Sequence, residues 1–142
     1  PLLNYFNGME TVTILFEVYP CSGRDDCIAQ EVLERSLISY TNYDLSIDIS
    51  RKIKFPKGLG SALSDLASIY IKHANYKQAI PLLNESVLLK IKIHDSLNLS
   101  NSYRKLSMAY FEIGLYEKSI DYIFKSIKLG NQINNQKQQS FA

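Results

Sequence analysis

The side chains with catalytic or metal-binding potential are few and scattered. His73 and His94 have no cysteine, serine or paired carboxylate at catalytic or metal-binding spacing, so we interpret both as helix-end or surface residues. Cys21 and Cys27 lie in a loop-like stretch, but a structural zinc site needs four ligands and no second Cys/His pair is near. A local disulfide would require export, and two free thiols of a cytosolic protein are the favoured interpretation. We therefore expect no catalytic residue, no metal, no cofactor and no enzyme activity.

Two further motifs have structural interpretations. Residues 56–61 (PKGLGS) are glycine-rich, but they lack the order of a phosphate-binding loop and do not follow a strand. We interpret them as a helix-to-helix connector, with Pro56 ending one element. Asp25 and Asp26 are interpreted as a charge pair preceding the helix that carries Ile28.

Overall composition argues against two classes of partner. The net charge is +2, and the basic residues are interspersed with acidic ones instead of forming a stripe. A nucleic-acid partner would require such a stripe to neutralise phosphates, so none is expected. Direct membrane insertion is not expected either, because no run of about 18 apolar residues occurs in the sequence.

The elements that position these side chains come from an internal repeat. Sliding the sequence until Lys52 falls on Lys92 superimposes many identical residues and also keeps apolar, aromatic and small positions in phase. The pairs of identical residues are Lys52/Lys92, Ile53/Ile93, Leu59/Leu99, Leu66/Leu106, Tyr70/Tyr110, Tyr76/Tyr116, Ile80/Ile120, Ser86/Ser126 and Leu89/Leu129.

Each repeated unit has the spacing of a pair of helices. Apolar residues recur every three or four positions through 59–70 and again through 76–87, as one face of a helix requires. The break between them is His73-Ala74-Asn75 in the first unit, where Asn75 is a suitable N-cap, and Ile113-Gly114-Leu115 in the second. The pattern predicts a helix, a tight turn and a second, longer helix. Pro81 should kink that second helix or delay its start.

The order of large and small residues resembles the tetratricopeptide repeat. The pattern is Leu66-Ala67-x-x-Tyr70, then Tyr76-x-x-Ala79, Leu83 and Ser86, with a second copy from Leu106 to Ser126. Small residues at 67, 79 and 86 would let paired helices approach closely. The resemblance implies an all-α fold, an α-α superhelix that forms a right-handed solenoid of antiparallel helix pairs. The period is 40 instead of about 34, so the extra residues should lengthen the second helix and its connector.

The expected organisation divides the chain into four parts. Residues 1–54 form a degenerate N-terminal helical region, 55–94 and 95–134 are two repeats, and 135–142 begin a truncated further repeat. A weaker match, which places Leu33 on Leu66, predicts helices near 25–40 and 43–54. Residues 11–19 fit a strand or a helical face, and helix is favoured because an isolated strand would have no pairing partner.

In such a stack the first helix of each pair lines the concave surface. Arg104 and Lys105 would grip a carboxylate or an acidic peptide there, and Met108 and Phe111 would supply apolar contacts. The alternative for Met108 and Phe111 is packing against a neighbouring helix. The predicted partner-binding residues are Ser64, Asp65, Ser68, Lys72, Asn101, Arg104, Lys105, Met108, Phe111 and Glu112, with Ser61 at the edge of the same face. Ser64 and Ser68 stand where a carboxylate clamp would need a basic residue and an asparagine.

The resemblance implies a scaffold that binds a protein or peptide on its concave face. The alternative is a sensory or regulatory segment of a larger signalling protein, such as a histidine kinase or transcription regulator. Uncapped ends of the solenoid would also allow self-association. The compartment stays open: cytoplasmic by default, or periplasmic if a signal peptide has been removed.

Overall fold

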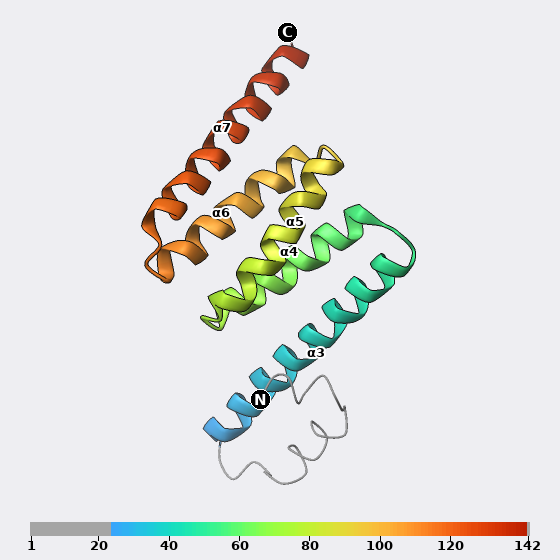
Figure 1. The fold of residues 1–142 in the computed structure, drawn as a ribbon. Helices are drawn as coiled ribbons and strands as arrows, with labels where there is room; N and C mark the ends of the chain where they lie inside the picture. The colour runs from blue at the N-terminus through green and yellow to red at the C-terminus, as the bar shows by residue number, and fades with distance from the viewer. Residues whose placement is uncertain (1–23, 142) are drawn as a thin grey trace. The chain divides into compact units, whose positions relative to one another are not determined.

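The computed structural model describes residues 24–141, and within them every regular element is an α-helix (Figure 1). The chain divides into two units between Leu37 and Ile38, and the functional features below lie in the second, whose described residues are 38–141. The predicted all-α fold is confirmed, whereas the helix expected at 11–19 lies outside the described residues. The helices are α3 (Arg24–Lys52), α4 (Pro56–Lys72), α5 (Tyr76–Lys92), α6 (Ser96–Glu112) and α7 (Tyr116–Ser140).

The repeat is built from helix-and-turn units that begin at regular intervals. Helices α4 to α7 begin at residues 56, 76, 96 and 116, and each is preceded by the same three-residue turn. In every turn the middle residue has a positive φ, as at Ala74 (56°) and Gly114 (80°). The N–H of Ala74 donates to Ile71 O at 3.0 Å and the N–H of Asn75 donates to Tyr70 O at 2.8 Å, and the other three turns repeat this pattern. This is the Schellman ending of a helix, which satisfies the last carbonyls and reverses the chain.

The two helices of the 55–94 repeat are equal in length, so the expectation of a longer second helix was wrong for this repeat. Helices α4 and α5 both contain 17 residues, so the residues beyond the usual period are shared between the two helices of the pair. Only α7, with 25 residues, is longer than its partner α6. Pro81 lies inside α5 and does not delay the start of that helix at Tyr76.

Helix α3 is continuous where two helices were predicted. The expected interruption between 40 and 43 does not occur, because Thr41 and Asn42 include neither glycine nor proline and no residue there has a positive φ. The alignment of Leu33 with Leu66 was therefore the wrong register. In the register of the main repeat, the end of α3 at Lys52 matches the end of α5 at Lys92, and the same turn follows both. Pro56 begins α4 at its first position instead of ending an element.

The core of the stack depends on small residues where paired helices cross. Ala67, Ala79 and Ser86 are fully buried, as predicted. Ser86 Oγ donates to the carbonyl oxygen of Gly60 at 2.6 Å, so α4 and α5 approach closely at this point. The equivalent bond in the next pair runs from Ser126 Oγ to Ser100 O at 2.9 Å. These contacts fix α4 against α5 and α6 against α7 as two hairpins of the same design.

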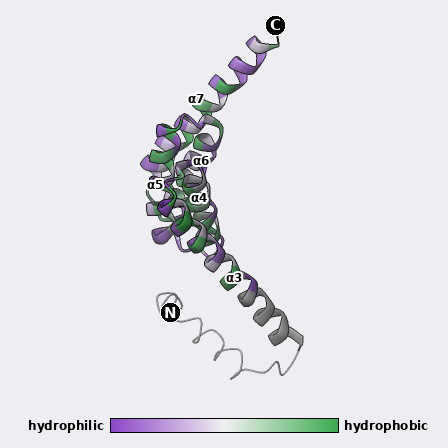
Figure 2. Ribbon diagram, turned by 90° about the vertical axis from the view of Figure 1, so that its right-hand side faces the viewer, coloured by the Kyte–Doolittle hydropathy of each residue, from purple (hydrophilic) through white to green (hydrophobic). Residues whose placement is uncertain are grey.

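Helix α7 continues beyond the length of its partner. The helix continues through residues 134–136 without a chain reversal. The last two helical turns of α7 carry mostly hydrophilic, exposed side chains (Figure 2). Residues 135–140 thus extend α7, and their assignment to a further repeat stays a prediction. None of the described helices is long and apolar enough to cross a membrane.

Candidate functional site

The first helices of the two hairpins, α4 and α6, are neighbours and enclose a groove of about 280 Å³ between them. We call it the α4–α6 groove. Five of the ten predicted partner-binding residues line it, and the sixth lining residue, Ile71, was not predicted. The lining residues are Ser68, Ile71, Lys72, Arg104, Lys105 and Met108.

Lys105 joins the two helices at the floor of the groove. Its ammonium group donates to Ser64 Oγ at 2.9 Å and to Ser64 O at 3.2 Å, and Ser64 itself is buried. Burial lowers the pKa of Lys105, and the positive charge of Arg104 lowers it further, while Asp65 opposes both effects. Ser64 and Lys105 therefore form an anchor between α4 and α6.

Two cations project from the sides of the groove. Lys72, in the last turn of α4, and Arg104, in the middle of α6, are both exposed, and neither has an ion-pair partner among the described residues. Ile71 and the exposed Met108 supply apolar walls between them. The groove thus combines positive charge with apolar surface, which suits an acidic group flanked by an apolar one.

The remaining predicted residues lie around the groove without lining it. Asp65, Asn101 and Glu112 are exposed on α4 and α6. Phe111 is exposed as well, but its ring packs edge-on against Tyr116 of α7, with ring centres 5.4 Å apart. Ser61 is half-buried near the start of α4.

Ile71 could have been found from the sequence. The repeat that aligns Tyr70 with Tyr110 also aligns Ile71 with Phe111, so both residues occupy the same position on successive first helices. An exposed aromatic residue is a stronger indication of a binding surface than its aliphatic equivalent, and the sequence therefore pointed to Phe111 alone.

Lys90 of α5 is a second feature that the sequence did not reveal. Its side chain is only 3% exposed and donates to Ser102 Oγ of α6 at 2.8 Å. Burial lowers the pKa of Lys90, and the nearby charge of Lys105 acts in the same direction. The residue does not line the groove, so it adds positive potential nearby without offering a contact.

The two histidines occupy the positions expected of them. His73 follows the last residue of α4, and His94 is the left-handed residue of the turn after α5; both are exposed. Within the part of the chain that the structure describes, no three His, Cys, Asp or Glu side chains gather as ligands for a metal ion. Cys21 lies outside the described residues, and Cys27 falls within the first turns of α3 instead of in a loop.

Comparison with known proteins agrees with the arrangement of the hairpins. Among solved structures, the chain is similar to the crystal structure of the TPR domain of Arabidopsis FLU, with a TM-score of 0.64 and 16% sequence identity. The similarity covers 72% of this chain and 88% of that one, and at this identity it concerns the fold alone. A comparison with curated protein sequences finds no significant match. The sequence model of the tetratricopeptide repeat matches residues 58–129, about half of the chain, a span that begins in the first turn of α4 and ends within α7. The chain therefore belongs to the tetratricopeptide repeat family, whose domains are generally protein-interaction scaffolds and typically non-catalytic.

Proposed function

We propose that the α4–α6 groove binds a segment of a partner protein in which an acidic residue stands beside an apolar one. The observation that carries the proposal is the pairing of Lys72 and Arg104 with the apolar walls of Ile71 and Met108 in one groove. The cations would hold the carboxylate, and Met108 would adapt its flexible side chain to the apolar neighbour.

The size of the groove supports a short contact segment. A volume of about 280 Å³ accommodates one or two side chains and not a whole helix. Affinity would therefore come from a few anchoring side chains, with the surrounding exposed positions Asp65, Asn101 and Glu112 setting preferences around them.

Lys72 and Arg104 are better targets for mutation than the adjacent pair Arg104 and Lys105. A glutamate at position 105 would place a carboxylate against the carbonyl oxygen of Ser64, so loss of binding could follow from misfolding. Lys72 and Arg104 are exposed, and reversing their charges should leave the helical fold intact.

The experiment is a selection from a displayed library of random peptides, performed with the wild type, with Lys72→Glu/Arg104→Glu and with a control. The control, Lys77→Glu/Lys92→Glu, makes the same change in net charge at exposed positions of α5. We expect wild type and control to enrich peptides with Asp or Glu next to Leu, Ile, Met or Phe, and the groove variant to lose the acidic preference. Equal enrichment by all three proteins would refute the proposal.

The alternative role, as a regulatory segment of a larger signalling protein, would use the same groove for recognition. It differs from a scaffold in the consequence of binding, which would be a change in an attached effector, and it stays a prediction.

A further inference from the structure

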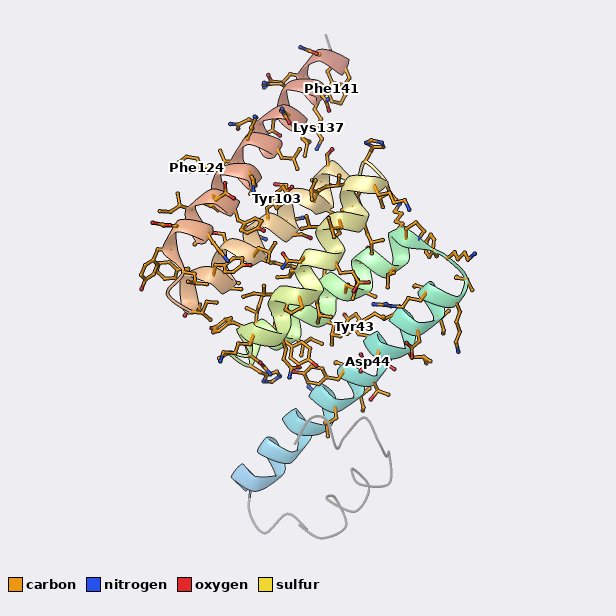
Figure 3. The ribbon with its side chains drawn as sticks, viewed as in Figure 1. Tyr43, Asp44, Tyr103, Phe124, Lys137 and Phe141 are labelled. Atoms are coloured by element: carbon orange, nitrogen blue, oxygen red, sulfur yellow. The ribbon has the colours of Figure 1, made fainter. Side chains whose placement is uncertain are left out.

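A second surface, separate from the groove, runs along the outer side of α7. Four apolar residues at helical spacing form a continuous stripe there, which we call the α7 stripe. They are Tyr116 (58% exposed), Ile120 (54%), Phe124 (65%) and Ile127 (52%). Phe124 projects from α7 on the side away from α6 (Figure 3).

The opposite side of α7 is already occupied by α6. Ser119 bonds to Ser107, Ser126 bonds to Ser100, and the ring of Tyr122 stacks on that of Tyr110 with centres 5.5 Å apart. Apart from Tyr116 at its N-terminal end, whose ring contacts Phe111 of α6, the α7 stripe is therefore not the face that holds the hairpin together.

The repeat shows what normally covers these positions. In the preceding hairpin the same positions on α5 are Tyr76, Ile80, Asn84 and Val87, and all four are buried or half-buried. Helix α6 packs against α5, and Val87 is 8% exposed where its equivalent Ile127 is 52% exposed. A helix placed on α7 as α6 is placed on α5 would bury the stripe.

Charges beside the stripe favour one such helix in particular. Glu117 and Lys128 are separated by about three turns of helix, so they lie on the same flank of the stripe. Both are exposed, and neither has an ion-pair partner among the described residues, whereas Asp121 is paired with Lys125 at 2.6 Å. The flank is acidic at its N-terminal end and basic at its C-terminal end.

A copy of α7 running in the opposite direction matches both features. In an antiparallel pair of helices, residues on the same flank face each other across the two-fold axis. With the axis near residue 122, Ile120 of one copy meets Phe124 of the other, and Glu117 meets Lys128. The apolar stripe and the charged flank have this same centre. We propose that two copies of this chain associate through antiparallel packing of their α7 stripes.

The test is the mass of the whole chain by sedimentation equilibrium over a range from low micromolar to millimolar. We expect a monomer–dimer equilibrium for the wild type and a monomer throughout for Phe124→Glu. The control Leu88→Glu, on an equally exposed apolar residue of α5, and the groove variant Lys72→Glu/Arg104→Glu should both dimerise as the wild type does. A monomeric wild type, or a dimer that survives Phe124→Glu, would overturn the proposal and leave the proposed groove function untouched.

A charge exchange tests the direction of packing. Glu117→Lys and Lys128→Glu should each weaken dimerisation about tenfold, because each pair occurs twice in the dimer and attraction becomes repulsion. The double variant, in which both charges are exchanged, should return to the wild-type dissociation constant. Failure of the double variant to recover would overturn the antiparallel arrangement. Circular dichroism of each variant confirms that the helices are intact.

Discussion

The left-handed residues of the turns allow a matched test of the repeat geometry. Ala74 and Gly114 occupy equivalent positions in the turns of the two hairpins, with φ of 56° and 80°. Only the second is a glycine, the residue that adopts this conformation without a steric cost. We predict that Ala74→Gly stabilises the protein and that Gly114→Ala destabilises it by a similar amount.

The magnitude follows from two opposing terms. A left-handed conformation costs a residue with a Cβ roughly 1–2 kcal/mol, because the Cβ crowds the following carbonyl oxygen. Glycine loses more backbone freedom on folding, which offsets about 0.4–1 kcal/mol of that gain. The net change should be about 0.5–1 kcal/mol, or roughly 2–4 °C in melting temperature for a folded unit of this size. Packing adds nothing at Gly114, since a Cβ built there meets no atom within 4 Å, and Ala74 is exposed.

The assay is urea and thermal unfolding of the wild type, the two single variants and the double variant, followed by circular dichroism. Opposite signs for the single variants and near cancellation in the double variant are expected, since a Cβ at position 114 meets no atom within 4 Å and therefore does not contact residue 74. If Ala74→Gly destabilises the protein, or Gly114→Ala leaves it unchanged, the shared geometry of the turns is wrong.

The further predictions concern three buried residues. Lys90→Met should stabilise the fold by about 1–3 kcal/mol at neutral pH, because it removes a buried charge, while the exposed control Lys92→Met should change stability by less than about 0.5 kcal/mol. Because the pKa of Lys90 is lowered in the folded protein, the unfolded chain binds the proton of Lys90 more tightly. The free energy of unfolding of the wild type, measured by urea titration, should therefore rise with pH through the mildly alkaline range. The rise should be smaller for Lys90→Met. Asp44 has a buried oxygen without a hydrogen-bond donor, and burial raises its pKa, with Asp48 adding to the effect. At neutral pH, Asp44→Asn should be more stable than the wild type by about 1 kcal/mol, because asparagine carries no charge. The folded protein binds the proton of Asp44 more tightly than the unfolded chain does, so lowering the pH should stabilise the wild type and reduce this difference. Leu106→Asp should unfold the stack, losing the far-ultraviolet helical signal, because it places an unpaired charge at a fully buried position.

The repeat made the hairpins predictable from the sequence. The helical spacing of large residues and the small residues at 67, 79 and 86 identified both helix pairs, and Gly114 marked one turn correctly. The break at His73-Ala74-Asn75 was also identified, but the left-handed conformation of Lys54, Ala74 and His94 was not, because none of them is the glycine that is usual at this position. All three residues are exposed, and the paired backbone hydrogen bonds of the Schellman ending accompany this conformation, which local propensity disfavours. Residue types alone therefore do not reveal that α4, α5 and α6, each with the turn that follows it, form units of equal length.

The groove was predictable in position but not in detail, for a related physical reason. Periodicity tells which residues share the outer side of α4 and α6, and it placed Lys72, Arg104 and Met108 there, which line the groove in the structure; their role in binding stays a prediction. It cannot tell how far a long side chain reaches across to the next helix. Lys105 bends over to Ser64 and ties the two helices together, and its part in binding a ligand stays a prediction. The same reach buries Lys90 against Ser102. Two of the lysines near the groove are thereby used within the stack, so the proposed recognition depends on Lys72 and Arg104, and their joint charge reversal is the most direct test of the site.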